Sequence, residues 1–85
     1  MDQLVIYTRP GCHLCNDMKA VVERVARAMH EPLRVAEIDI SADPALEQRY
    51  GREIPVLTVN GKKVAKYRVG EGELLRILNQ RALDE

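Results

Sequence analysis

The sequence contains no tryptophan or phenylalanine, and only two cysteines occur among its 85 residues. A core without large aromatic side chains must come mainly from aliphatic residues, with Tyr7, Tyr50 and Tyr67 as the available aromatic contributors. Thirteen basic residues balance thirteen acidic ones, so the chain carries no formal net charge. This balance gives no electrostatic indication of a nucleic-acid or membrane partner, and we expect neither.

Long hydrophobic runs are also missing from the sequence. No segment approaches the roughly 20 apolar residues that cross a bilayer, and residues 1–6 lack the basic start of a signal peptide. We therefore expect a cytoplasmic protein. Structural disulfides are rare in that compartment, so a lone pair of cysteines is more typical there of catalysis or metal binding. The length favours a single domain that spans residues 1–85.

Strand-like and helix-like segments alternate along the chain in the order β-α-β-α-β-β-α. The strands are expected at residues 4–8, 33–40, 55–59 and 63–67, and the helices at residues 12–29, 45–50 and 73–83. A strand, a helix and a second strand form a right-handed parallel unit, and Asn60-Gly61 predicts a hairpin between the last two strands. The sequence therefore predicts an α/β domain with a four-stranded mixed sheet flanked by helices.

Local signals indicate where several of these elements begin and end. Asp43 and Pro44 offer an N-cap and a first-turn proline for the second helix. The dipeptide Glu31-Pro32 is expected to end the first helix. The alternation of apolar and polar residues is imperfect at 33–40, which suits a strand covered on both faces.

Cys12 and Cys15 lie three residues apart at the expected start of the first helix. Two thiols in one helical turn lie close enough to form a disulfide with little rearrangement. A helix N-terminus also stabilises the thiolate, which is the reactive form of cysteine. The pattern favours reversible thiol–disulfide exchange, in which Cys12 attacks and Cys15 resolves the mixed disulfide. Two buried cysteines that only pack fit less well, because Cys12 is expected at an exposed turn.

His13 lies between the two cysteines and is expected to face solvent. Two interpretations stay open: a protonated imidazole would favour the Cys12 thiolate, or the position merely tolerates a polar residue. A metal site with four ligands from one chain is not expected, because His30 is predicted to lie roughly 25 Å away at the far end of the same helix. A metal ion or cluster shared between two subunits stays open.

The order of elements, with the CxxC motif at the first strand-to-helix junction and a proline opening the third strand, resembles the thioredoxin fold. Within that fold the chain is most similar to the glutaredoxin-like family, and the resemblance covers nearly the whole chain. The matching motifs are residues 7–15 (Tyr-Thr-Arg-Pro-Gly-Cys-His-Leu-Cys), Asp39-Ile40 and residues 50–56 (Tyr-Gly-Arg-Glu-Ile-Pro-Val). The resemblance implies a thiol–disulfide oxidoreductase that needs no bound cofactor and uses glutathione as co-substrate.

The resemblance further implies that a cis peptide bond precedes Pro55, and that the main chain of Ile54 pairs with a bound peptide or with glutathione. Arg9 and Arg52 lie three residues before Cys12 and before Pro55, where glutaredoxins commonly carry basic residues that hold glutathione carboxylates. The alternatives are an ordinary trans proline at the start of a strand and two solvated surface arginines.

The chain departs from the glutaredoxin pattern in two places. His13-Leu14 stands between the cysteines instead of the usual Pro-Tyr. The glycine pair and acidic residues that hold the ends of glutathione after the hairpin are out of register, and Gly70, Gly72 and Glu73 are the candidates to replace them. These departures concern glutathione binding and leave the dithiol chemistry unchanged.

Several alternatives follow from the residues. The CxxC pair fits a binding module that carries a metal ion or bridges a cluster in a dimer, and the fold also suits a redox-inert docking scaffold. A thioredoxin-reductase-type partner is the alternative to glutathione as reductant. We expect a monomer whose partners are disulfide-containing proteins or glutathione; the physiological substrate and the redox potential do not follow from the sequence.

Overall fold

The computed structural model describes residues 2–29 and 33–84 of the chain. Its elements are β1 (Asp2–Thr8), α1 (His13–Ala28), β2 (Leu33–Asp39), the 3-10 turn η1 (Ile40–Ala42), α2 (Pro44–Tyr50), β3 (Val56–Val59), β4 (Lys62–Lys66) and α3 (Glu71–Asp84). The predicted order and the α/β class are confirmed. The expected helix stop at Glu31-Pro32 and the position of His30 lie outside the described residues.

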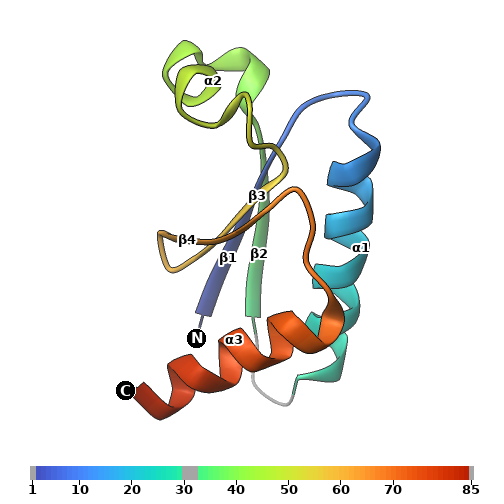
Figure 1. Ribbon diagram of the computed structural model, residues 1–85, viewed down its shortest axis with the longest axis vertical. Helices are drawn as coiled ribbons and strands as arrows, with labels where there is room; N and C mark the ends of the chain where they lie inside the picture. Colours follow the sequence, from blue (N-terminus) through green and yellow to red (C-terminus); the bar gives the residue numbers. More distant parts are fainter. Residues whose placement is uncertain (1, 30–32, 85) are drawn as a thin grey trace.

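The four strands form one mixed sheet in the order β2-β1-β3-β4 (Figure 1). Strand β1 pairs in parallel with β2, as expected for a strand–helix–strand unit, and antiparallel with β3. Strand β4 pairs antiparallel with β3. The first strand therefore lies in the interior of the sheet, and β2 and β4 form its two edges.

The hairpin between β3 and β4 follows the sequence signal at Asn60-Gly61. Asn60 has φ 51° and Gly61 has φ 87°, which are the left-handed values that a tight two-residue hairpin turn requires. The Asn60 side chain also joins the turn to β1, because its Oδ1 accepts the Gln3 N–H at 2.9 Å and its Nδ2 donates to Asp2 at 2.9 Å. The hairpin is thus held to the first strand at its tip.

The start of α2 is also as the sequence predicts. Asp43 is the N-cap and accepts the backbone N–H of Ala45 at 2.9 Å, while Pro44 occupies the first helical turn. These contacts satisfy donors that have no partner inside the helix. The second helix therefore begins on a purely local signal.

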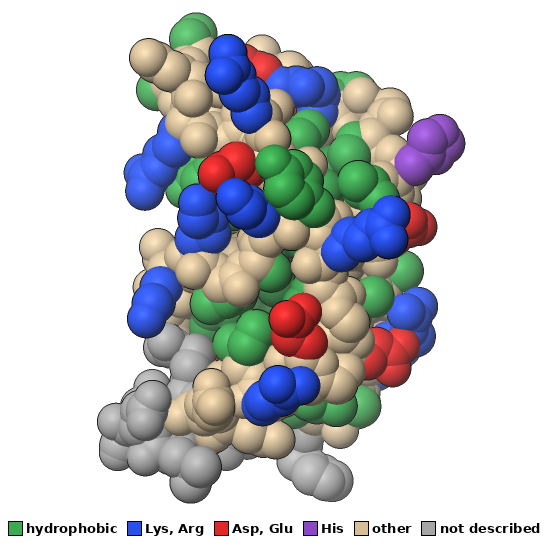
Figure 2. Space-filling model, viewed as in Figure 1, with side chains coloured by type: hydrophobic (Ala, Val, Ile, Leu, Met, Phe, Trp, Pro, Cys, Tyr) green, Lys and Arg blue, Asp and Glu red, His purple; other side chains and the backbone are tan. Residues whose placement is uncertain are grey.

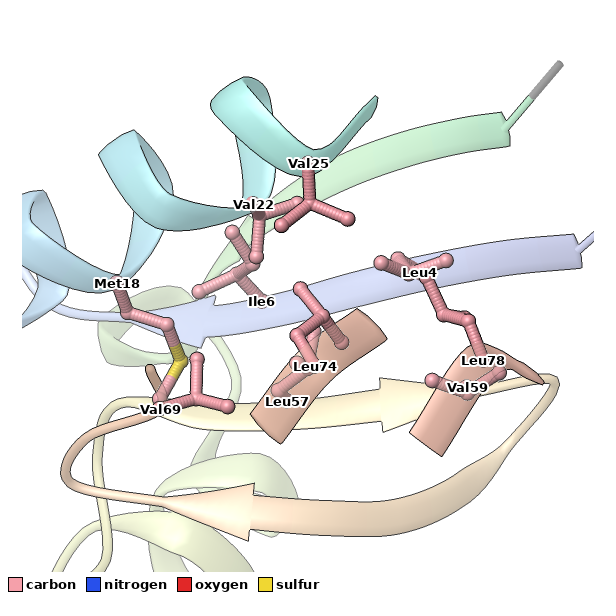
Figure 3. Packing of buried hydrophobic residues seen from close by; sticks show 10 residues of the cluster. All are labelled: Leu4, Ile6, Met18, Val22, Val25, Leu57, Val59, Val69, Leu74 and Leu78. Atoms are coloured by element: carbon pink, nitrogen blue, oxygen red, sulfur yellow. The ribbon is translucent and has the colours of Figure 1, made fainter. Parts of the chain in front are cut away.

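Side chains from both faces of the sheet build two hydrophobic clusters, one larger than the other. The larger cluster joins β1 and β3 to α1 and α3, and Figure 3 shows its members Leu4, Ile6, Met18, Val22, Val25, Leu57, Val59, Val69, Leu74 and Leu78. Because side chains alternate between the faces of a strand, Val56 points the other way and packs with Ile40 and Tyr50. Helices α1 and α3 therefore cover one face, and α2 lies against the other.

Two expectations about burial are wrong. In β2, Arg34, Val35, Glu37 and Asp39 are exposed, so this strand is not covered on both faces. The reason is its place at the edge of the sheet, since the buried cluster forms over β1 and β3. Tyr67 is 43% exposed and adds little to the core.

The other two tyrosines do contribute to the core. The ring of Tyr7 stacks on Tyr50 with 4.3 Å between centroids. Partial burial, and then the neighbouring Tyr50, raise the pKa of Tyr7 above its ordinary value. This pair extends the smaller cluster beneath α2.

Replacing Leu57 with alanine should lower the free energy of unfolding by about 2–5 kcal/mol, because the leucine is fully buried and its truncation leaves a cavity. Val35→Ala is the matched control on an exposed position of β2 and should change stability by no more than about 0.5 kcal/mol. Urea unfolding followed by circular dichroism measures both values. Equal losses for the two variants would contradict the assigned core.

Candidate redox site

Cys12 is the N-cap residue of α1. Strand β1 ends at Thr8, and the chain turns through Gly11, whose φ of 79° lies in the left-handed region that glycine adopts without strain. The Cys12 Sγ atom then accepts the backbone N–H of Cys15 at 3.0 Å. The sulfur of Cys12 therefore occupies the position that a Ser or Asp oxygen takes at other helix starts.

Cys15 lies one turn inside the helix and differs from Cys12 in exposure. Its side chain is 3% exposed, whereas Cys12 is half-buried. The Cα atoms lie 5.2 Å apart and the sulfurs are within disulfide distance. The two positions are thus those expected for an accessible thiol and a protected one. The N–H donor and the helix dipole both favour a negative charge on the Cys12 sulfur.

The segment before β3 lies at the same end of the central strands as the cysteines. Val56 pairs with Tyr7 across β1 and β3, so Ile54 and Pro55 lie beside the end of β1 that leads to Cys12. The Ile54–Pro55 peptide bond is cis, as the resemblance implies. The structure therefore brings the proline segment and the cysteine pair to one place.

Hydrogen bonds hold this segment at Glu53, directly before Ile54. The Glu53 N–H donates to the Tyr50 carbonyl at 2.8 Å, and the Glu53 carboxylate binds Lys63 at 2.8 Å. The hydrogen bond from Lys63 holds the pKa of Glu53 below its ordinary value. Within the described residues, no hydrogen bond occupies the main-chain N–H or carbonyl of Ile54. The peptide groups of this residue remain free for a ligand.

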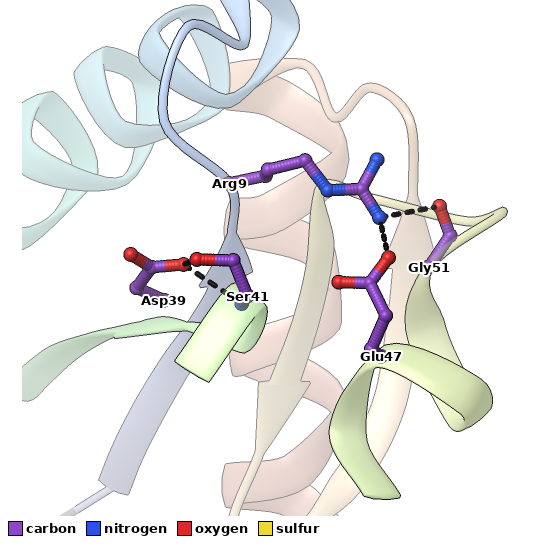
Figure 4. A network of polar contacts seen from close by, with 5 residues as sticks. All are labelled: Arg9, Asp39, Ser41, Glu47 and Gly51. Carbon is purple, nitrogen blue, oxygen red and sulfur yellow. Dashed lines mark hydrogen bonds and ion pairs between the residues drawn. The ribbon is translucent and has the colours of Figure 1, made fainter. Parts of the chain in front are cut away.

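A cavity of about 180 Å³ lies on the β2 side of the cysteine pair. Its lining includes both cysteines together with Arg9, Glu37 and Asp39. Asp39 Oδ1 accepts the Ser41 hydroxyl at 2.6 Å and the Ser41 N–H at 2.8 Å (Figure 4). These two bonds, led by that of the hydroxyl, lower the pKa of Asp39, so its carboxylate is charged at neutral pH.

The two arginines expected to bind a ligand have different surroundings. Arg9 forms an ion pair with Glu47 of α2 and also donates to the Gly51 carbonyl at 3.4 Å (Figure 4). Arg52 is exposed, and no hydrogen bond or ion pair of its side chain occurs among the residues described. The guanidinium of Arg9 thus ties the cysteine loop to α2, and that of Arg52 is free to meet an anion.

Three further predictions concern His13, Leu14 and the residues around the start of α3. His13 is exposed on the first turn of α1, as expected. Leu14 is half-buried and lines a groove of about 240 Å³ with Tyr67 and Arg68. Gly70, Gly72 and Glu73 are exposed around the start of α3 (Gly70 just ahead of it), and their role stays a prediction.

Sequence reasoning missed three contributions to this region. Glu47 neutralises Arg9, Asp39 adds charge to the cavity wall, and the Tyr67 hydroxyl donates to the Arg52 carbonyl at 3.0 Å. Asp39 had a signal in the motif Asp39-Ile40, although that motif did not indicate its place beside the cysteines. Glu47 and Tyr67 had none, because their partners are distant in the sequence.

No group of three or more His, Cys, Asp or Glu side chains in residues 2–29 and 33–84 is arranged to hold a metal ion. No helix in the described part of the chain has the length and apolar character needed to cross a bilayer.

Comparison with known proteins places this site in a family. The profile described as "Glutaredoxin-like domain (DUF836)" matches residues 3–79. A thioredoxin of Methanocaldococcus jannaschii is 32% identical over 60 residues, which cover 69% of this chain and 71% of that protein.

Solved structures agree with this assignment. The target protein XcR50 from X. campestris is 31% identical with a TM-score of 0.72, and the match covers 91% of this chain and 96% of that one. A chloroplastic thioredoxin z has a TM-score of 0.76 at 18% identity, over 94% of this chain and 77% of that one, which shows the shared fold.

The thioredoxin-like fold and a cysteine pair at disulfide distance together indicate a redox function. With the match over residues 3–79, they show that the chain belongs to the glutaredoxin-like family of thioredoxin-fold proteins.

Proposed function

We propose that this protein is a thiol–disulfide oxidoreductase that reduces protein or small-molecule disulfides with the Cys12–Cys15 couple. The observation that carries the proposal is the position of the Cys12 sulfur, which accepts the Cys15 N–H at 3.0 Å and caps α1. This contact supports a thiolate at Cys12, while the buried Cys15 is protected from outside reactants until a mixed disulfide forms.

The reaction takes place in two exchange steps. The Cys12 thiolate attacks one sulfur of a substrate disulfide, so that a mixed disulfide forms and the other substrate sulfur leaves as a thiolate that takes up a proton. Cys15 then loses its proton and attacks the Cys12 sulfur, which releases the second substrate thiol and forms the Cys12–Cys15 disulfide. Two electrons pass from the protein dithiol to the substrate, and no bound cofactor is required.

We propose glutathione as the reductant that restores the dithiol. One glutathione thiolate attacks the Cys12–Cys15 disulfide, and a second attacks the resulting adduct on Cys12, so that glutathione disulfide is released and both protein thiols are regenerated. The adduct forms on Cys12 because this sulfur is more accessible than that of Cys15.

The charges around the pair favour one direction of approach for an anionic thiol. Glu37 and Asp39 lie on the β2 side and repel the glutathione carboxylates. On the β3 side, the free guanidinium of Arg52 and the unpaired peptide groups of Ile54 offer charge-assisted and main-chain hydrogen bonds. A protonated His13 on the exposed first helical turn would add positive charge near Cys12. Arg9 contributes less to such binding, because Glu47 already neutralises it.

Replacing Cys12 with serine should abolish disulfide reduction, because no thiolate then starts the exchange. Replacing Cys15 with serine should leave a first exchange step and trap the adduct on Cys12. Intact mass spectrometry after incubation with oxidised glutathione measures both outcomes, with one glutathione added to Cys15→Ser and none to Cys12→Ser. Full activity of Cys12→Ser would contradict the oxidoreductase assignment. Stoichiometric metal in the reduced wild-type protein would favour the metal-binding alternative.

Replacing Arg52 with glutamine should raise the KM for glutathione about fivefold, since an exposed charge pair contributes up to about 1 kcal/mol. The matched control is Arg27→Gln at the far end of α1, which should leave the KM unchanged. Steady-state reduction of a mixed disulfide at varied glutathione measures both constants. An unchanged KM in Arg52→Gln would remove this contact from the proposal, and failure of glutathione to reduce the wild-type disulfide would point to a thioredoxin-reductase-type partner.

A further inference from the structure

Tyr67 has an unusual backbone and an exposed ring. It follows β4 directly and has φ 69°, a left-handed value that is uncommon for a residue other than glycine. Its side chain is 43% exposed, so burial of the ring does not account for this conformation. Residues in strained backbone conformations persist where surrounding contacts hold them, and such residues are frequent at functional sites.

The two hydrogen bonds that Tyr67 donates both lead to the segment before β3. Its hydroxyl donates to the Arg52 carbonyl at 3.0 Å, and its backbone N–H donates to the Pro55 carbonyl at 2.8 Å. One residue therefore binds the segment on both sides of Ile54. With this left-handed backbone, the N–H and the phenol of Tyr67 both reach the segment of residues 52–55.

Strand β4 adds a second set of contacts to the same segment. The Glu53 carboxylate binds Lys63 at 2.8 Å and Lys66 at 3.7 Å, and the Lys66 ammonium lies 5.6 Å from the centre of the Tyr67 ring. Figure 2 shows Lys and Arg side chains gathered with an acidic side chain on this part of the surface. Strand β4 thus holds Glu53, and Tyr67 holds Arg52 and Pro55, while the peptide groups of Ile54 stay unpaired.

We propose that Tyr67 is a positioning residue that holds Ile54 in place for main-chain pairing with a substrate polypeptide. This inference rests on the proposed oxidoreductase function. A segment that is already ordered loses less conformational freedom when a ligand binds, so its affinity is higher. The Tyr67 hydroxyl supplies this order through Arg52 and does not itself touch the reacting sulfurs.

The ring of Tyr67 also lines the groove of about 240 Å³ along α1, together with Leu14, Met18 and Val69. A polypeptide bound beside the cysteines would meet this ring and the Ile54 peptide groups at the same time. A small disulfide that is bound only at the sulfur would reach neither. The contribution of Tyr67 should therefore be larger for polypeptide substrates than for small ones.

The test replaces Tyr67 with phenylalanine, which keeps the ring and removes the bond to Arg52. For insulin as the disulfide substrate, the KM should rise about threefold to tenfold, as expected for loss of one hydrogen bond. The kcat, the redox equilibrium of the cysteine pair with glutathione and the melting temperature should stay unchanged. The KM for hydroxyethyl disulfide should change less than twofold, because this small disulfide does not reach the Ile54 peptide groups. Arg27→Gln, at the far end of α1, is the control and should leave both KM values unchanged.

Amide hydrogen exchange gives a second readout that is independent of activity. The Glu53 N–H is bonded to the Tyr50 carbonyl, so a looser segment should exchange this proton faster in Tyr67→Phe than in wild type. An unchanged insulin KM in Tyr67→Phe, or a parallel change in KM, kcat and melting temperature, would overturn the positioning role. Failure of the wild-type protein to reduce insulin and hydroxyethyl disulfide would instead overturn the oxidoreductase function itself.

Discussion

Packing of α1 against the two central strands is the interaction on which the redox site depends. Val22 of the helix lies fully buried with Ile6 of β1 and Leu57 of β3. This contact fixes the helix start next to the end of β1, so the loop of a few residues between them places Cys12 at the N-cap. The reactive sulfur consequently meets the Cys15 N–H, and the second sulfur is buried beneath the first turn.

The position of β1 inside the sheet gives the cysteine pair two different sides. The strand order puts β2 on one side of β1 and β3 on the other. Asp39 from the β2 side keeps a charged carboxylate at the cavity wall. The segment before β3 carries Arg52 and Ile54, and strand β4 braces it through Lys63 and Lys66. An anionic ligand would therefore meet repulsion on one side and open peptide groups on the other.

Elements with local causes could be predicted from the sequence, and those set by strand order could not. The Asn60-Gly61 hairpin and the Asp43 cap depend on residues within a few positions of each other, and both are present as expected. The burial of β2 depends on its place at the sheet edge, which hydrophobic pattern does not report, so the expected cover on both faces was wrong. The cis bond before Pro55 was predicted from family resemblance rather than from its neighbours in the chain.

The order of strands and helices and the place of two thiols at a helix start can be read from the sequence, because they follow from propensity, periodicity and capping over short stretches. The partners of the charged and polar groups around the thiols emerge only in the folded chain. The ion pair of Arg9 with Glu47 joins residues 38 positions apart, and the bond from Tyr67 to Arg52 joins residues 15 apart. Such contacts form when packed elements bring distant segments together, so no local pattern records them.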